Sequence, residues 1–363
     1  MKQRIESVDL LRGITIAAMI LVNTPGDWGS VYAPLLHAEW HGLTPTDLIF
    51  PFFLFIVGIS IYYAYKYKSN TTGTYKKVAV RSLKLIGLGL FLNIFTPIPP
   101  FFEALDTVRI SGVLQRIGIV FFITAWLYLN CNWKTLLGIT FAILLGYWLF
   151  LGFVPLPNGT APTFERAANN WSNFIDLKVF GKHMWQPDYD PEGLIGTIPA
   201  IATSLLGVLI GKFLDSEGLH KAIKLIGLGV LGIVLGYMWH LVFPLNKALW
   251  SSSFVLATAG YGTLILGIIY FIVDVKGWHF GAIFKYAGMN AITVYFLSSL
   301  ISKIFYLIPV GENDNIHSWL YKTFFVHDFL PANFSSLSYA VVVVLCYLGL
   351  GLYLYKKKIF IKV

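Results

Sequence analysis

Long apolar segments alternate with polar connections along the chain. A helix needs about 20 mostly apolar residues to cross a bilayer, whereas the strands of a membrane barrel alternate over about 10 residues. The apolar runs here are continuous and do not alternate, so we predict about ten membrane-spanning helices. Their approximate bounds are 10–24, 46–65, 82–95, 112–130, 134–154, 193–212, 222–243, 252–273, 282–307 and 338–355.

The ends of these segments refine the prediction. Segment 82–95 is the weakest, because it is short, carries Lys84 near its start and is followed by Pro97. The first segment has Asp9 and Arg12 in its first turn and lacks a small-residue cleavage site, so we expect no cleavable signal peptide. The pattern predicts an all-α, polytopic membrane protein that forms one domain over residues 1–363.

Composition agrees with this interpretation, and charge adds an orientation. Hydrophobic residues make up 56% of the chain and charged residues 12%, against about 25% charged residues in soluble domains. The net charge is +9, and cations collect on cytoplasmic loops of membrane proteins. If the N-terminus is inside, the inside segments hold Lys2, Arg4, Lys66, Lys68, Lys76, Lys77, Arg81, Lys134, Lys212, Lys221, Lys276, Lys356, Lys357, Lys358 and Lys362. The outside segments hold only Arg109, Arg166, Lys178, Lys182, Lys247 and Lys322.

Both termini are therefore predicted to be cytoplasmic, and the basic tail is explained by topology without nucleic acid as a partner. Cys131 and Cys346 lie at or within spans in distant parts of the chain. Two such residues build neither a disulfide framework nor a metal motif. We expect no metal and no bound cofactor.

Polar residues occur in or at the ends of the spans, where each would cost a few kcal/mol if it faced lipid. An ion pair such as Asp9 with Arg12, or a helix cap from Thr44 or Thr46, is the simpler interpretation of any single one. So large a set predicts a polar cavity, which the outside loops 155–192 and 308–337 would either cover or merely pack above. The set is Asp9, Arg12, Asn23, Asp47, Arg109, Gln115, Arg116, Glu192, Asn246 and Asn290.

The stretch 37–47 is the strongest candidate for chemistry. It holds two histidines and two acids but no lysine or arginine, between two apolar segments. His37 and His41 are four residues apart, a spacing that binds zinc on a helix, but Gly42 and Pro45 favour a loop. General-base chemistry fits better, because a neutral imidazole takes up a proton near neutral pH. Asp47 or Asn23 would orient such a base.

Several blocks in this order resemble the heparan-alpha-glucosaminide N-acetyltransferase family of transmembrane acyltransferases, including its bacterial members. The matching blocks are 7–13 (SVDLLRG), 22–23 (VN), 37–47 (HAEWHGLTPTD), 50–51 (FP), 112–118 (GVLQRIG), 190–198 (DPEGLIGTI), 246–251 (NKALWS) and 288–291 (GMNA). Because several such blocks occur in one order and are spread over most of the chain, they are far more specific than any single motif.

The resemblance implies transfer of an acetyl group from cytosolic acetyl-CoA to the amine of a glucosamine-type sugar across the membrane, with acetyl-CoA as co-substrate. It also implies that His37 is the general base and that Asn23 and Asp47 assist it. Asp47 would orient the imidazole, and Asn23 would bind the acetyl carbonyl or its oxyanion. Direct transfer in a ternary complex is the expected route, and a route through acetylated His37 is the alternative.

Candidate binding residues follow from position and chemistry. For the phosphates of acetyl-CoA we predict Arg81, Lys84 and Arg116, near the inside ends of spans; simple topological anchoring is the alternative for Lys84. For the sugar we predict Glu192, Trp40, Trp250, Asn246 and Asn290. Membrane anchoring is the alternative role of each tryptophan.

Two other functions suit a polar interior surrounded by spanning helices. One is an amino-sugar transporter, and the other is an acyltransferase that acts on a cell-envelope polymer or lipid. Under the preferred interpretation, the protein is a multi-pass protein of the bacterial inner membrane. Its partners are then acetyl-CoA, the amino-sugar acceptor, membrane lipid and a second copy in a homodimer.

Overall fold

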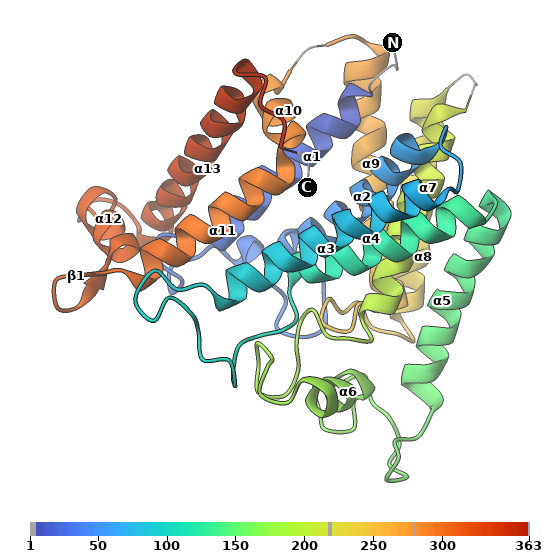
Figure 1. The fold of residues 1–363 in the computed structure, drawn as a ribbon, viewed down its shortest axis with the longest axis horizontal. Coiled ribbons are helices and arrows are strands. Elements are labelled where there is room, and N and C mark those ends of the chain that lie inside the picture. Colours follow the sequence, from blue (N-terminus) through green and yellow to red (C-terminus); the bar gives the residue numbers. More distant parts are fainter. Residues whose placement is uncertain (1–4, 217–219, 279, 362–363) are drawn as a thin grey trace.

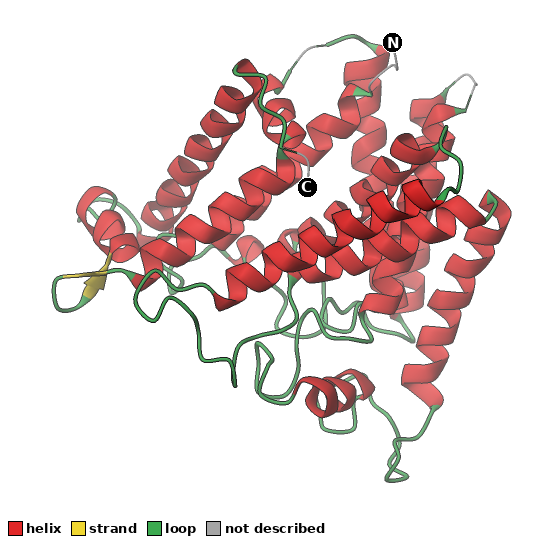
Figure 2. Cartoon of the chain, viewed as in Figure 1, coloured by secondary structure: helices red, strands yellow, loops and turns green. Residues whose placement is uncertain are grey.

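A computed structural model describes residues 5–216, 220–278 and 280–361 as a bundle of long helices (Figures 1 and 2). Lys2, Arg4 and Lys362, which we assigned to the inside face, lie outside the described residues. The only strands among the described residues are the two-residue β1 (Pro309–Val310) and β2 (Asp314–Asn315), which pair as a small hairpin. The predicted all-α, polytopic membrane fold is confirmed.

Every predicted segment coincides with a helix or a helix pair. The long helices are α1 (Glu6–Asn23), α2 (Ile49–Tyr65), α3 (Thr72–Ile94), α4 (Val113–Asn130), α5 (Trp133–Phe153), α7 (Thr197–Asp215), α8 (Lys221–His240), α9 (Ser252–Tyr270), α10 (Ala282–Met289) with α11 (Ala291–Leu307), and α13 (Ala332–Lys356). Shorter elements lie in the connections: η1 (Ala33–Leu35), η2 (Pro45–Leu48), α6 (Trp171–Phe180), η3 (Phe271–Val275) and α12 (Ile316–Phe324).

Two details differ from the predicted spans. Segment 282–307 is not one straight helix, because α10 and α11 meet at Asn290 with a bend of 85°. By length and apolar composition, seven described helices qualify as spans, or eight if the bent pair counts as one. Helices α1 and α3 fall short because charges interrupt them: Glu6, Asp9 and Arg12 in α1, and four cations in α3.

Small residues bring the helices into close contact. Along the α8–α9 pair, Gly229 lies against the backbone of Leu264, and Gly236 lies against that of Ala257. A side chain at either glycine would collide with the facing backbone. Close approach through glycine replaces the hydrophobic driving force, which is weak between helices surrounded by lipid.

The connections separate into two ends of the bundle. Helix α1 begins and α13 ends at one end, while α6 and the long connections lie at the other (Figure 1). The long connections are 24–44, 95–112, 154–196, 241–251 and 308–331. We call the end with the long connections the outer end and the opposite end the inner end. The stretch around His37 belongs to the outer end.

Candidate functional site

The loop from His37 to Asp47 is organised around the carboxylate of Asp47. Thr44 and Asp47 cap η2 reciprocally, as the sequence predicted for Thr44, and Asp47 is 1% exposed. Its Oδ2 accepts hydrogen bonds from the backbone N–H groups of Ala38 and Thr44, each at 3.1 Å. Its Oδ1 lies 2.7 Å from Nδ1 of His37. Because a carboxylate only accepts, Nδ1 is the donor and Nε2 of His37 keeps its lone pair.

His37 opens into the largest of the cavities described, which we call the outer cavity, with a volume of about 710 Å³. The exposed Asn23, at the last turn of α1, lines the same cavity. Glu192 also lines this cavity. One cavity therefore brings together the predicted general base His37, the predicted carbonyl ligand Asn23 and the predicted sugar ligand Glu192. Further polar groups in its lining are Arg109 and Lys247, from two other connections, and Ser302, on α11.

Lys247 is the functional candidate that sequence reasoning missed. Its Nζ lies 3.1 Å from Nε2 and 3.2 Å from Nδ1 of His37, and 4.0 Å from Oδ1 of Asp47. Burial lowers the pKa of the Lys247 ammonium, and the charges of Glu192 and Asp47 only partly oppose this shift. The sequence did contain a hint of this role, because Lys247 is one of the few predicted outside cations and lies in the matched block 246–251. Its nearness to His37 depends on contact across 210 residues.

His41 and the other residues of this region form a wall behind the outer cavity. Nδ1 of His41 lies 3.2 Å from the amide nitrogen of Asn246, and Nε2 lies 3.3 Å from Glu165. Asn246 is fully buried and accepts from the backbone N–H of Leu249. Trp40 donates through its indole N–H to the carbonyl of Phe164. The structure therefore places Trp40 and Asn246, predicted sugar ligands, in contacts that hold the loop.

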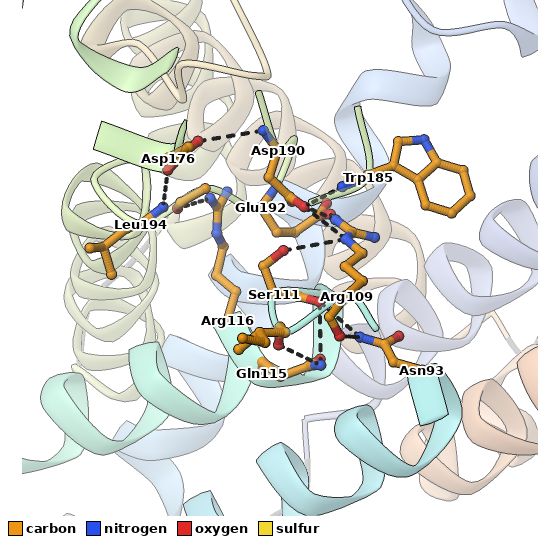
Figure 3. A network of polar contacts seen from close by, with 12 residues as sticks. Asn93, Arg109, Ser111, Gln115, Arg116, Asp176, Trp185, Asp190, Glu192 and Leu194 are labelled. Carbon is orange, nitrogen blue, oxygen red and sulfur yellow. Dashed lines mark hydrogen bonds and ion pairs between the residues drawn. The ribbon is translucent and has the colours of Figure 1, made fainter. Parts of the chain in front are cut away.

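Arg109, Trp185 and Glu192, which line the outer cavity, belong to a network of polar contacts (Figure 3). Arg109 donates to Asp190 at 2.9 and 2.5 Å and also pairs with Glu192. The Arg109 guanidinium stacks on the ring of Trp185, which is 66% exposed. Burial opposes ionisation of Asp190, but the hydrogen bonds and charge of Arg109 outweigh it, so the pKa of Asp190 is lowered. This network ties connection 95–112 to connection 154–196.

The same network holds Arg116, which we predicted near the phosphates of acetyl-CoA. Arg116 is 2% exposed; its Nη2 donates to the carbonyl of Gly193 at 2.7 Å, and its guanidinium lies over Trp250. Trp250, a predicted sugar platform, is fully buried and donates to Thr203. Both residues are therefore placed in the protein core near the outer end, and neither belongs to the lining of a cavity described here.

A second cavity of about 370 Å³, the inner cavity, lies toward the inner end. Arg12 and Arg81 line it together with Ser60 and Asn290. Arg12 pairs with Asp9 at 2.9 Å, as predicted, and donates to Ser60 at 2.8 Å. The buried Nε of Arg81 has no hydrogen-bond partner within the described part of the chain. Lys84 is exposed and is not among the lining residues.

Asn290 lies in the inner cavity and not beside His37. Its side chain bonds to the backbone of Ile359 and Ile361, at 3.1 Å each, at the bend between α10 and α11. The two cavities nevertheless share part of their walls. Four residues line both of them: Met19, Phe53, Val113 and Tyr295. The cavities therefore meet back to back at these residues, which we call the waist.

The family model described as "Heparan-alpha-glucosaminide N-acetyltransferase, catalytic" matches residues 4–229. The chain belongs to this family. It is 32% identical over 355 residues to the heparan-alpha-glucosaminide N-acetyltransferase of Homo sapiens, and 31% identical over 357 residues to that of Mus musculus.

The matches cover 80% of this chain but only 52% and 53% of the two relatives, so the chain spans about half their length. The family resemblance inferred from the sequence blocks is confirmed. The matched range 4–229 includes His37, Asp47 and the Arg109 network, whereas Lys247 lies beyond it.

Asp176, beneath the network, makes a testable contribution to stability. It accepts from the backbone N–H of Leu194 at 2.9 Å, and burial raises its pKa from 3.8 to about 6. A carboxyl that holds its proton more tightly when folded stabilises the protein at low pH and loses this contribution as the pH rises from about 4 through 6. Asp190 has a lowered pKa, so it stabilises the protein when it is ionised, and this contribution is lost only at more acidic pH. We expect Asp176→Asn to raise the thermal midpoint above pH 6 and to flatten its pH dependence.

The measurement is the thermal midpoint of the purified protein, followed by tryptophan fluorescence between pH 4.5 and 8. Asp188→Asn is the control, because Asp188 pairs with Arg166 on the exposed surface. A pH profile of Asp176→Asn that matches the wild type would contradict the expected role.

Proposed function

We propose that this protein is a membrane N-acetyltransferase that moves an acetyl group from acetyl-CoA in the inner cavity to the amine of a glucosamine-type sugar in the outer cavity. The observation that supports the proposal is the shared waist, because it sets a cavity lined by His37 directly against one lined by Arg12 and Arg81. Family membership supports the reaction class, since the relatives are named as heparan-alpha-glucosaminide N-acetyltransferases.

His37 is the general base in this proposal. The amine nitrogen attacks the thioester carbonyl, and Nε2 of His37 takes its proton while Asp47 stabilises the resulting imidazolium. When the tetrahedral intermediate collapses, the C–S bond breaks, the C–N bond remains, and the departing sulfur takes up a proton to leave as CoA thiol. Asn23 donates to the carbonyl oxygen as charge develops there. Direct transfer remains the preferred route, and acetylated His37 the alternative.

The donor is proposed to enter from the inner end. Arg12 and Arg81 supply positive charge for the phosphates of CoA, and Asn290 lies with them in the same cavity. The pantetheine arm is about 15–20 Å long on ordinary bond lengths, shorter than the hydrocarbon core of about 30 Å. It reaches His37 only through a cavity that penetrates the membrane, and we propose that it passes at the waist, where the two cavities share their wall.

The acceptor is proposed to bind in the outer cavity beside His37. Glu192 lines this cavity and is oriented by Arg109, so its free carboxylate oxygen is available to sugar hydroxyls or to an ammonium. Trp185, which is exposed and lines the same cavity, is better placed than Trp250 to stack on a sugar ring. The outer cavity is therefore the amino-sugar site.

Orientation and assembly complete the proposal. The cations of the described residues gather at the inner end, which makes that end cytoplasmic by the positive-inside rule. We propose that the protein lies in the bacterial inner membrane with both termini in the cytoplasm. Contact with specific lipid and the homodimer remain predictions.

The test uses purified protein in lipid nanodiscs with acetyl-CoA and glucosamine. We expect release of CoA thiol in equal amount to N-acetylated sugar identified by mass spectrometry. Folded protein that yields neither product would exclude the enzyme as proposed. The transporter alternative predicts instead that proteoliposomes accumulate glucosamine without acetyl-CoA.

Lys247 is expected to assist the transfer by charge. Its ammonium lies at Nε2 of His37, where it would obstruct proton transfer, so we propose that it moves to the thioester oxygen when acetyl-CoA binds. We expect Lys247→Met to lower kcat/KM about 10²–10³-fold, the usual cost of one oxyanion donor. Lys247→Arg keeps the charge and should lose less. A faster Lys247→Met enzyme would mean that Lys247 only obstructs His37.

The waist is expected to carry the pantetheine arm. Val113 begins α4 and lines both cavities, so Val113→Trp narrows the passage without removing a polar group. We expect turnover to fall at least about 10²-fold, because a displaced thioester loses its alignment with the amine. Acetyl-CoA binding, measured by calorimetry, should change little, because the phosphates bind at the inner end. Val113→Ala is the control, and unchanged turnover of Val113→Trp would exclude this route.

A further inference from the structure

A third hollow, of about 400 Å³, lies beside the outer cavity between α11 and α13. One face of α13 supplies most of one wall, through residues spaced three and four apart: Tyr339, Val342, Val343, Cys346, Tyr347 and Leu350. On α11, Ile301 and Phe305 supply the opposite wall. We call this hollow the apolar slot. From Tyr339 to Leu350 it follows α13 for about 16 Å, starting near the outer end.

The apolar slot adjoins the outer cavity and shares part of its wall. Thr24, directly after α1, and Ser302, on α11, line both of them. The two hollows differ in polarity. The outer cavity is lined by His37, Glu192 and Lys247, whereas most of the side chains that line the slot are apolar. A ligand that fills both must therefore have a polar head and an apolar chain.

The shared part of the wall is held in place by hydrogen bonds. Helix α12 covers the outer end of the slot, and its buried His317 contacts the hydroxyl groups of Tyr306 and Tyr339, each at 3.1 Å. Nε2 of His317 also lies 3.1 Å from the carbonyl of Gly26, two residues after Thr24. These bonds fix the segment after Thr24, so the wall that the slot shares with the cavity has a defined shape.

We infer that the acceptor is a lipid-linked amino sugar, whose sugar lies in the outer cavity and whose aliphatic chain lies in the apolar slot. The inference rests on the proposed acetyl transfer and names its acceptor class. Val342 lines the slot and is 45% exposed on α13, a candidate membrane span, so in this inference that side of the slot faces the bilayer. The lipid would enter from the membrane and present its amine to His37 without leaving the bilayer. A chain of about twelve carbons spans the length of the slot.

The wall shared with the outer cavity favours this occupant over a second copy of the chain. A neighbouring protein would cover the exposed side of the slot, but that role gives no reason for the slot to share Thr24 and Ser302 with the cavity that holds His37. An ordinary bilayer lipid would fill the slot but would leave the sugar site empty. Only an amphiphile with an amino-sugar head uses both hollows together.

The experiment compares dodecyl glucosaminide with free glucosamine as acceptor, in nanodiscs of fixed lipid content. Val342→Trp fills the slot, and Leu345→Trp is the matched control, since Leu345 is 56% exposed on α13 but does not line the slot. Neither substitution should change how dodecyl glucosaminide partitions into the lipid, so partitioning does not distinguish the two variants. We expect Val342→Trp to raise the KM for dodecyl glucosaminide about 10- to 100-fold, an effect of the size that a misfit of one methylene group causes in a hydrophobic pocket.

The KM for free glucosamine should stay unchanged in both variants, which separates this inference from the proposed function. If wild-type protein acetylates glucosamine but Val342→Trp and Leu345→Trp give the same KM for the amphiphile, the lipid-linked acceptor is excluded. If glucosamine itself is not acetylated, the proposed function fails. Dissociation of an oligomer by Val342→Trp in native mass spectrometry would assign the slot to a second copy.

A labelling measurement keeps the inference testable if Val342→Trp folds poorly. Cys346 is exposed and lines the slot, whereas Cys131 lies between α4 and α5 at the inner end and provides an internal reference. We expect dodecyl glucosaminide to slow alkylation of Cys346 by a membrane-permeant maleimide, with Cys131 unaffected. Dodecyl maltoside, which has the same chain without the amine, should protect less. Equal rates with and without dodecyl glucosaminide would overturn the inference.

Discussion

Replacing His37 by alanine is expected to lower kcat/KM for glucosamine by about 10²–10⁴-fold, the range that a positioned general base contributes. The imidazole is held by Asp47 at 2.7 Å and lines the outer cavity, so its loss removes the proton acceptor without disturbing the core. The measurement is the rate of CoA thiol release at saturating acetyl-CoA. His37→Gln tests whether hydrogen bonding alone sustains the reaction.

His41→Ala is the control for this prediction. His41 has the same chemistry and lies four residues away, but its ring nitrogens face Asn246 and Glu165. We expect its removal to lower thermal stability modestly and to leave kcat/KM within about tenfold of the wild type. If His41→Ala loses activity while His37→Ala keeps it, the roles of the two histidines are reversed.

Replacing Arg109 by methionine is expected to have the largest effect on stability. Asp190 is fully buried and the Glu192 side chain is 8% exposed, so both carboxylates would be left without their guanidinium partner. Removing one partner of a buried ion pair costs about 3–5 kcal/mol of unfolding free energy. Because Glu192 lines the outer cavity, the KM for glucosamine should rise as well.

Arg166→Met provides the matched control. Arg166 and Asp188 form a similar two-point ion pair, but the two side chains are 42% and 41% exposed. A solvated pair contributes about 0–1 kcal/mol, so this substitution should barely shift the thermal midpoint. Equal shifts of the thermal midpoint in Arg109→Met and Arg166→Met would show that the ion pairs of Arg109 contribute no more to stability than a surface ion pair does. Both midpoints are measured in the same detergent by tryptophan fluorescence.

The helices could be predicted well from the sequence because each depends on a local property. An apolar run of sufficient length must satisfy its own backbone in lipid, and only a helix does so within one segment. The bend between α10 and α11 was missed, because the sequence around Asn290 is as apolar as that of an unbroken span. The charge of Arg12 in α1 is tolerated because Asp9 and Ser60 bond to its guanidinium in the folded protein.

The candidate site was predictable only where its parts are close in the chain. His37 and Asp47 are ten residues apart, and Thr44 and Asp47 form a local cap, so the sequence pointed to them together. Lys247 reaches His37 across 210 residues, and no local pattern marks that contact. Arg109 meets Asp190 across 81 residues for the same reason.

The sequence by itself determined the helical membrane fold, the family and the histidine that deserves testing, because hydrophobic length and matched blocks are properties of the chain as written. The tertiary structure decided which polar residues share a space. Trp250 and Trp185 have the same side chain, yet one is buried against Thr203 and the other lines the outer cavity. Only packing distinguishes them, because burial depends on neighbours that come from other segments.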